Sequence, residues 1–472
     1  MNHEPLKNFL LLLFCTFYPA WTSAQTNDSL AVAKFYNEAL ASHEAYENLQ
    51  YLCSNIGGRL CGSPQSAEAV GWTKSLMERT GADTVYLQEV MVPHWVRGER
   101  ETAQIMSEVS GNIPVGVCAL GGSVGTGREG LAGQVIEVSH MDALRALGSE
   151  VNGKIIFFNR PADQRFVNTF RSYSSAVDQR VSGAAEAALL GAAGVVVRAV
   201  TTAFDTVPHT GITRYEKDGK NIPAVAISTK DADILSDLLT KDPELRFFFR
   251  TTCGWKPDEL SHNVIGEFRG SQFPDEFITI GGHLDSWDLG EGAHDDGAGC
   301  IQSIEVLRLF KALNIVPRHT IRVVMFMDEE ISQSGSKAYA ERALEKKEKH
   351  FLALEADRGG FTPFGFSIDV PDSLFYLISE YRVLFEPYGA DRFTRGGSGP
   401  DIWRLKEQGA LVAGLVVDSQ RYFDYHHSAK DTFDKVNRRE LQLGSAAMAA
   451  FVYLLDRDDS LKDMSGFTNL KP

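Results

Sequence analysis

Apolar stretches in the second half of the chain repeatedly end at acidic and histidine side chains. Short apolar stretches of this kind, separated by helical spacing, predict alternating strands and helices. Residues 277–280 lead to His283, 320–327 to Glu329 and Glu330, 351–356 to Asp357, and 410–417 to the loop with His426 and His427. Open α/β sheets place ligand sites beyond the carboxyl ends of their strands. The sequence therefore predicts a mixed, mostly parallel sheet covered by helices, with these side chains gathered in one crevice.

Changes in the spacing of apolar residues and turns along the chain predict how it divides into segments. A chain of 472 residues is too long for a single typical core. Residues 25–119 contain helical spacing broken by a glycine-rich loop, and we assign them to the first part of the domain that carries these acidic and histidine side chains. Residues 120–252 alternate short apolar stretches with turns, which predicts an inserted, strand-rich domain. Residues 253–472 form the rest of that domain, and apolar residues on one face of 297–313 predict a helix that covers the sheet.

The first residues have the pattern of an export signal. An apolar stretch from Phe9 to Tyr18 precedes the small residues Thr22 and Ala24, so we expect residues 1–24 to be a signal peptide cleaved near Ala24. The stretch is short for a membrane span, and a secreted or periplasmic protein without a span after leader removal is expected. An uncleaved anchor and a lipid anchor at Cys15 are the alternatives, although the preceding Phe14 is bulkier than lipidation sites prefer.

Composition narrows the chemistry that is available. A net charge of −15 disfavours binding to nucleic acid, which needs a basic surface to displace counterions from phosphates. The chain has six cysteines, but no Cys-x-x-Cys pair, so a thiolate zinc site is not expected. A metal ion would have to use histidine and carboxylate ligands.

Three of the polar motifs have the residue types of a metal centre with two ions. Catalytic zinc accepts imidazole nitrogen and carboxylate oxygen, and two neighbouring ions need a bridging oxygen ligand. Asp285 lies two residues after His283 and can orient its imidazole, while Asp295 follows a glycine-rich turn and is the candidate bridge. Side chains of the adjacent Glu329 and Glu330 diverge, so that one can bind metal while the other faces a bound water.

The order of these motifs resembles a known family. His283-Leu-Asp285, Asp295-Asp-Gly, Glu329-Glu330, Asp357 and His427-Ser-Ala-Lys-Asp-Thr are similar to the co-catalytic zinc aminopeptidase and glutamate carboxypeptidase family. The resemblance extends over nearly all of the mature chain, because residues 120–252 are similar to the protease-associated domain that such enzymes carry. It implies a zinc exopeptidase that acts on peptides or dipeptides, and a possible homodimer.

The resemblance also implies a role for each motif residue. One of two Zn²⁺ ions would be bound by His283, Asp295 and Asp357, and the other by Asp295, Glu330 and His427. Glu329 would be the general base and acid, and Asp285 would orient His283. Some relatives have a tyrosine before the last ligand, where it polarises the scissile carbonyl, whereas this chain has His426. The donor to the oxyanion therefore stays open: His426 either replaces the tyrosine or only packs.

Other functions have weaker patterns. Gly121-Gly-Ser123-Val-Gly125 matches the nucleophile elbow of serine hydrolases, but the residues that follow do not favour the helix that an elbow needs. A receptor-like protein without catalysis is a second alternative, although all five ligand positions retain their chemistry. Residues 395–401 are a candidate lining of the substrate pocket or an ordinary loop. The ligands do not decide between carboxypeptidase, dipeptidase and aminopeptidase activity.

Overall fold

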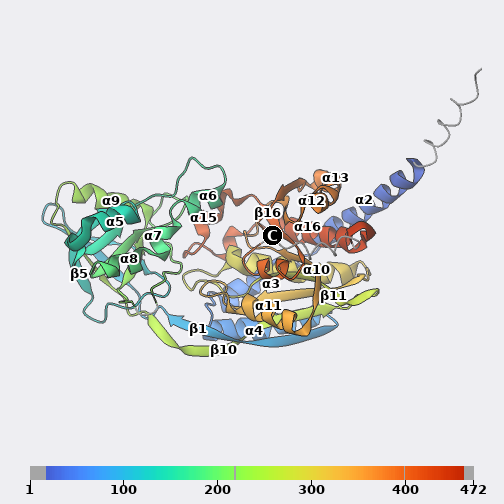
Figure 1. Cartoon of the computed structure of the whole chain (residues 1–472), viewed down its shortest axis with the longest axis horizontal. Coiled ribbons are helices and arrows are strands. Elements are labelled where there is room, and N and C mark those ends of the chain that lie inside the picture. Colours follow the sequence, from blue (N-terminus) through green and yellow to red (C-terminus); the bar gives the residue numbers. More distant parts are fainter. Residues whose placement is uncertain (1–17, 217–218, 398, 462–472) are drawn as a thin grey trace, which may run out of the picture.

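The computed structural model describes residues 18–216, 219–397 and 399–461. Residues 1–17, with Cys15 and most of the predicted leader, lie outside the described residues, and the predicted cleavage near Ala24 falls within helix α2 (Tyr18–Ala41). Within the described residues, no helix combines the length and apolarity needed to cross a bilayer. Figure 1 shows two lobes: a smaller one that contains the predicted insert together with the strands just before it, and a larger one formed by the other described segments.

The larger lobe is built on an eight-stranded mixed sheet. Its strand order is β1-β10-β12-β11-β13-β16-β14-β15, and β12, β11, β13 and β16 pair in parallel at its centre. The strands are β1 (Thr84–Val96), β10 (Gly254–Phe268), β11 (Phe273–His283), β12 (His319–Phe326), β13 (Lys349–Glu355), β14 (Pro363–Asp369), β15 (Arg392–Arg395) and β16 (Leu411–Val417). The predicted mixed α/β fold and its four central strands are confirmed.

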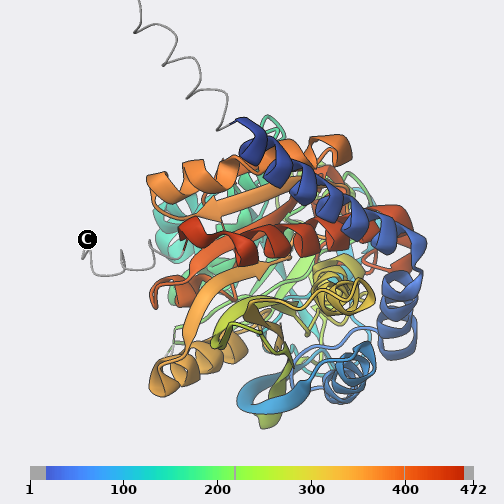
Figure 2. The ribbon, with the colours of Figure 1, turned by 90° about the vertical axis from the view of Figure 1, so that its right-hand side faces the viewer.

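The helices of the larger lobe pack on this sheet and on one another through buried apolar residues. They are α2, α3 (Glu44–Tyr51), α4 (Pro64–Thr80), α10 (Ala298–Ala312), α11 (Ser334–Lys346), α12 (Asp372–Ser379), α13 (Arg382–Phe385), α14 (Trp403–Lys406), α15 (Tyr422–Tyr425) and α16 (Arg438–Arg457). The predicted helix over 297–313 is α10, and its Phe310 is fully buried with its ring centroid 5.2 Å from that of Phe35 in α2. Helix α16 packs against both α2 and α10 (Figure 2). These contacts join the N-terminal and C-terminal segments in one core.

The boundaries of α4 illustrate how the sequence specifies a helix. Ser63 caps its start, with Oγ accepting a hydrogen bond from the Ser66 backbone N–H, and Pro64 occupies the first turn. Gly81 ends the helix with a φ of +90°, a left-handed conformation that glycine adopts without strain.

The smaller lobe contains a second eight-stranded sheet, in the order β3-β2-β9-β5-β6-β7-β8-β4. Its strands are β2 (Thr102–Ser107), β3 (Gly111–Val115), β4 (Val117–Ala119), β5 (Leu131–Val138), β6 (Ile155–Phe158), β7 (Gly194–Arg198), β8 (Ala224–Ile227) and β9 (Arg246–Arg250), and its helices are α5 (Met141–Leu147), α6 (Thr169–Ser174), α7 (Val177–Val181), α8 (Gly183–Leu189) and α9 (Thr229–Leu239). Strands β2, β3 and β4 precede residue 120, the predicted start of the insert. We call the lobe from Thr102 to Arg250 the inserted lobe.

Two connections hold the lobes together. The antiparallel strands β1 and β10 run from the large sheet to the point where the chain enters and leaves the inserted lobe (Figure 1). On another side, α6 lies beside α15, where the rings of Phe170 and Tyr422 are stacked with centroids 5.6 Å apart. Lys430 forms an ion pair with Asp205 of the inserted lobe at 2.7 Å. The loop that carries His426 and His427 is therefore packed directly against the inserted lobe.

Candidate metal centre

All five predicted metal ligands converge at one place. They lie at the end of β11, before α10, and in the segments after β12, β13 and α15. The distances are 3.2 Å from His283 Nε2 to Asp295 Oδ1, 3.6 Å from His283 Nε2 to Asp357 Oδ1, 3.4 Å from His427 Nε2 to Asp295 Oδ2, and 3.0 Å from His427 Nε2 to Glu330 Oε2. The two carboxylate oxygens of Asp295 thus face two different histidines, which is the arrangement that a bridging ligand requires.

Asp295 is held by backbone contacts that the sequence analysis did not identify. The backbone N–H groups of His294 and Asp295 donate to the Asp431 carboxylate at 2.7 and 3.1 Å. Asp296 accepts hydrogen bonds of 3.1 Å from the N–H groups of both His283 and Gly299. Asp296 directly follows the predicted ligand Asp295, and Asp431 lies four residues after the predicted ligand His427. This proximity in sequence is the only feature from which their role could have been predicted.

Asp285 contacts two parts of the centre through different groups. Its backbone oxygen lies 3.0 Å from His283 Nδ1, while its carboxylate is 3.8 Å from the same nitrogen. The carboxylate oxygens accept hydrogen bonds from the backbone N–H groups of Glu329 and Glu330 at 3.1 and 3.4 Å. Asp285 therefore connects the orientation of the His283 ring to the turn that carries both glutamates.

The two adjacent glutamates point to different partners. Glu330 faces His427, whereas Glu329 Oε1 accepts a 3.3 Å hydrogen bond from Gln333 Nε2. Burial and the charges of Asp401 and Asp357 raise the pKa of Glu329 to about 8, despite the opposing effect of His283. A carboxyl group with a raised pKa beside a cluster of ligand-type side chains has the properties of a general acid or base.

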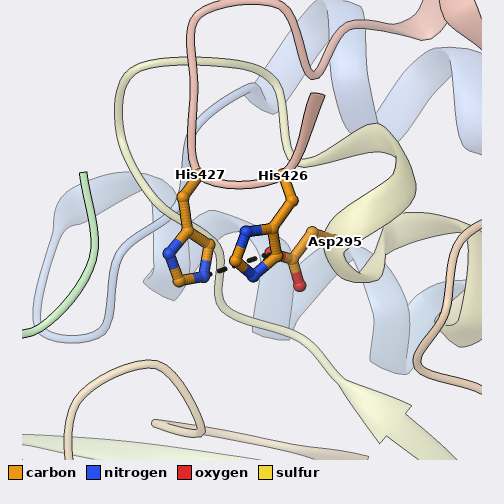
Figure 3. Close-up of side chains that lie close together, drawn as sticks. All are labelled: Asp295, His426 and His427. Atoms are coloured by element: carbon orange, nitrogen blue, oxygen red, sulfur yellow. Dashed lines mark ion pairs between the residues drawn. The ribbon is translucent and has the colours of Figure 1, made fainter. Parts of the chain in front are cut away.

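His426 lies directly against His427. Their rings are stacked with centroids 3.5 Å apart, and His426 Nε2 is 3.7 Å from Asp295 Oδ2. Figure 3 shows both imidazoles extending from one loop toward Asp295. Burial and the charge of Arg180 lower the pKa of His426 well below its usual value, so the ring is neutral and can bind a cation.

A tyrosine also reaches this centre, although it does not occupy the position before the last ligand. Tyr422 is buried, and its hydroxyl group interacts electrostatically with Asp295 and Asp357. Burial and these charges raise the pKa of Tyr422 well above its usual value, which keeps the hydroxyl group protonated as a hydrogen-bond donor.

The inserted lobe holds the backbone of the histidine loop. His209 Nδ1 contacts the His426 carbonyl oxygen at 2.7 Å, and the Thr210 N–H group donates to the His427 carbonyl oxygen at 2.8 Å. Arg180 Nη1 lies 3.5 Å from His427 Nδ1. His427 has a φ of +60°, which is strained for a residue with a Cβ atom and persists only when its surroundings hold it.

The donor set fits one or more divalent cations. Asp295 Oδ2, Glu330 Oε1 and Asp357 Oδ1 are buried, and each lacks a hydrogen-bond partner within the described ranges. Buried carboxylates without partners are costly, and a cation coordinated by carboxylate and imidazole removes that cost. His283, Asp295, Glu330, Asp357 and His427 could therefore hold metal, and His426 offers a further imidazole nitrogen.

The remaining predicted positions lie in two other environments. Ser123 is fully buried, its Oγ accepts a hydrogen bond from the Ala224 N–H group at 2.8 Å, and no helix follows it before β5. This environment does not suit a nucleophile elbow.

In segment 395–401, Ser398 lies outside the described residues, and the Asp401 N–H group donates to Glu355 Oε2 at 3.1 Å. This contact places part of the segment beside β13, which ends two residues before Asp357.

Comparisons with known proteins agree with this geometry. The profile of peptidase family M28 matches residues 263–452. Carboxypeptidase Q of Bos taurus is 32% identical over 415 residues, which cover 88% of this chain and 86% of that protein. The crystal structure of a peptidase M28 precursor from Shewanella amazonensis has 34% identity and a TM-score of 0.87, and the match covers 92% of this chain and 98% of that one.

A more distant structure shares the fold. A zinc aminopeptidase from Bacillus subtilis has 19% identity and a TM-score of 0.63, with 87% of this chain and 94% of that chain covered. The fold and the site together define a metallo-exopeptidase, as the order of the motifs predicted. The chain belongs to peptidase family M28. Two sequence motifs, Glu355-Ala-Asp-Arg-Gly-Gly and the histidine loop, predict this similarity to carboxypeptidase Q, which is also called plasma glutamate carboxypeptidase.

Proposed function

We propose that this protein is a zinc exopeptidase of the carboxypeptidase Q type, which releases terminal residues from peptides or dipeptides with two Zn²⁺ ions. The observation that supports two ions is the position of Asp295, whose separate oxygens face His283 and His427. The similarity to carboxypeptidase Q supports cleavage at the carboxyl end.

Each ion would have three protein ligands. His283, Asp295 and Asp357 would hold one ion, and Asp295, Glu330 and His427 the other. When bound, such ions supply Lewis-acid activation of a water and of the scissile carbonyl. The three carboxylate oxygens without hydrogen-bond partners belong to proposed ligands whose charges a pair of cations would balance.

Glu329 would carry the proton during hydrolysis. It would accept a proton from the attacking water and donate it to the leaving amine. Asp285 would orient His283 and, through the backbone N–H group of Glu329, fix the turn that presents the general base. His426, next to Asp295, would face the substrate carbonyl as a hydrogen-bond donor in the position where some relatives have tyrosine.

Several finer expectations belong to the same proposal. A signal peptide over residues 1–24 would direct the enzyme to the periplasm or the extracellular space, and the active form would be a homodimer. An aminopeptidase is the competing activity within the family. A serine hydrolase is disfavoured by the burial of Ser123, and a receptor-like protein by the presence of Glu329 beside a full set of ligands.

The experiment compares the zinc-loaded protein with Glu329→Gln. We expect zinc content of two ions per chain in both proteins, and a kcat about 10²- to 10⁴-fold lower in the variant, because only proton transfer is removed. Glu341→Gln, at an exposed position on α11, is the matched control and should leave both quantities unchanged. Zinc-loaded wild-type protein that hydrolyses no peptide, or a Glu329→Gln variant with full activity, would refute the proposal.

A further inference from the structure

The metal centre is most open to solvent on the side of Asp357, whose side chain is 17% exposed. The side chains of the other proposed ligands are 1% to 9% exposed; they are His283, Asp295, Glu330 and His427. A substrate therefore approaches the centre most readily past Asp357. The residue that follows Asp357 in the chain is Arg358.

The Arg358 guanidinium group lies beside this opening. Its central carbon is 5.6 Å from the centroid of the Phe170 ring, and the Tyr422 ring stacks on the same ring with centroids 5.6 Å apart. The charge of Arg358 interacts with Asp357 and with the Tyr422 hydroxyl group, which itself interacts with Asp295. Arg358 is thus close enough to contact the same peptide that the metal centre would hold.

One nitrogen of Arg358 is anchored, and the other two are available. Nη2 donates hydrogen bonds to the Gly397 carbonyl oxygen at 2.9 Å and to Ser367 Oγ at 3.4 Å. Within the ranges that the structure describes, Nε and Nη1 have no hydrogen-bond partner, and Arg358 forms no ion pair. The side chain is half-buried, and neither of these two nitrogens is fully enclosed. The guanidinium group is therefore held in place while part of it faces outward.

This arrangement suits an anionic ligand. A half-buried cation without an ion pair loses part of its hydration and gains no compensating charge. Asp357 would not supply that charge in the zinc-loaded protein, because a bound cation would balance it. A guanidinium group presents its N–H donors in a planar fork that matches the two oxygens of a carboxylate. Peptides carry a carboxylate at their carboxyl end and on acidic side chains.

We propose that Arg358 binds a carboxylate of the peptide whose scissile bond lies at the metal centre. The inference rests on the proposed function and deepens it, because it names a residue that selects anionic substrates. The carboxylate comes from the terminal residue or from an acidic side chain beside the scissile bond. Segment 395–401, a candidate lining of the substrate pocket, contributes through Gly397, which fixes the guanidinium group.

The test measures dipeptide affinity in the zinc-loaded full-length Glu329→Gln variant, which should bind peptides without cleaving them. One matched pair is alanylphenylalanine and its carboxyl amide, and the other is glutamylphenylalanine and glutaminylphenylalanine. We expect the charged member of one pair to have a Kd about 10- to 100-fold lower than its neutral partner, because only the charged member pairs with Arg358. The pair that shows the difference identifies which carboxylate is bound.

Two further substitutions in this parent variant separate carboxylate binding from a structural effect. Arg358→Gln should abolish the difference within the pair and leave the affinity for the neutral member unchanged, whereas Arg358→Lys, which retains the charge, should keep part of it. Arg382→Gln, at an exposed position on α13, is the control and should retain the full difference. An equal loss of affinity for charged and neutral members in Arg358→Gln would mean that Arg358 only anchors segment 395–401, and would overturn the inference.

The outcomes also distinguish the inference from the proposed function. Carboxylate binding that depends on Arg358, in a protein whose wild type cleaves no peptide with zinc, would refute the proposed function and leave the binding site. Zinc-dependent cleavage by the wild type, without a difference in either pair, would refute the binding site and leave a zinc exopeptidase.

Discussion

Replacing His209 by alanine should weaken zinc binding, although His209 belongs to the inserted lobe and is not a proposed ligand. Its side chain is buried, and Nδ1 is 2.7 Å from the His426 carbonyl oxygen, so the ring must donate there. Loss of the ring leaves a buried carbonyl group without its partner, which costs about 1–3 kcal/mol.

This cost falls on the loop that carries His427. The φ of +60° at His427 is strained by about 1–3 kcal/mol, and contacts from the inserted lobe offset that strain. When one of them is lost, the loop can relax, and His427 Nε2 then moves away from Glu330 and Asp295. We therefore expect zinc affinity to fall about 10- to 100-fold, as it does when groups that orient metal ligands are removed.

The assay is zinc affinity by competition with a chromogenic chelator, together with kcat at saturating zinc, which should recover most of its wild-type value. His209→Asn should restore affinity, because its amide nitrogen can occupy the place of Nδ1. His140→Ala, at an exposed position of the same lobe, is the control. Unchanged zinc affinity in His209→Ala would refute the conclusion that the inserted lobe positions His427.

Two predictions concern stability. Burial alone would raise the pKa of Glu348, but contacts with His350 and Arg322 outweigh it and lower the pKa from 4.5 to about 2. The ionised Glu348 carboxylate therefore stabilises the folded state above pH 4.5, and this stabilisation is lost as the pH falls toward 2. The difference in unfolding free energy between wild type and Glu348→Gln should shrink over that range. A difference that stays constant would contradict the lowered pKa. Phe310→Ala should cost about 3–5 kcal/mol in urea unfolding, because Phe310 is fully buried, whereas Leu344→Ala, 67% exposed, should cost less than about 0.5 kcal/mol.

The sequence was most informative where structure and chemistry depend on local pattern. The strands ending near His283, Glu330 and Asp357 could be predicted because apolar stretches and turns define strands, and parallel strands bring their carboxyl ends together. Helix α10 could be predicted from its apolar face for the same reason.

Contacts between distant segments could not be predicted in this way. His209 and Thr210 lie far along the chain from His427, and no local pattern indicates that their lobe touches the histidine loop. Tyr422 was not predicted because the resemblance places a tyrosine directly before the last ligand, which is position 426 in this chain. The one-turn helix α15 instead brings Tyr422, four residues further upstream, to Asp295. Strands β2 to β4 were predicted to precede the inserted lobe because β2 pairs with β9 and β4 with β8, which come more than a hundred residues later, and β3, among the described residues, pairs only with β2.

The pairing of Val96 with Gly254 has a consequence for how this enzyme can diversify. The chain leaves the large sheet at Val96 and returns to it at the directly paired Gly254. A tight turn could therefore join these two residues, as in a β-hairpin. A chain shortened in this way would keep its central sheet but lose His209 and Thr210, which contact the histidine loop. Changes on the far side of that rung would therefore alter how the histidine loop is held while the scaffold stays constant.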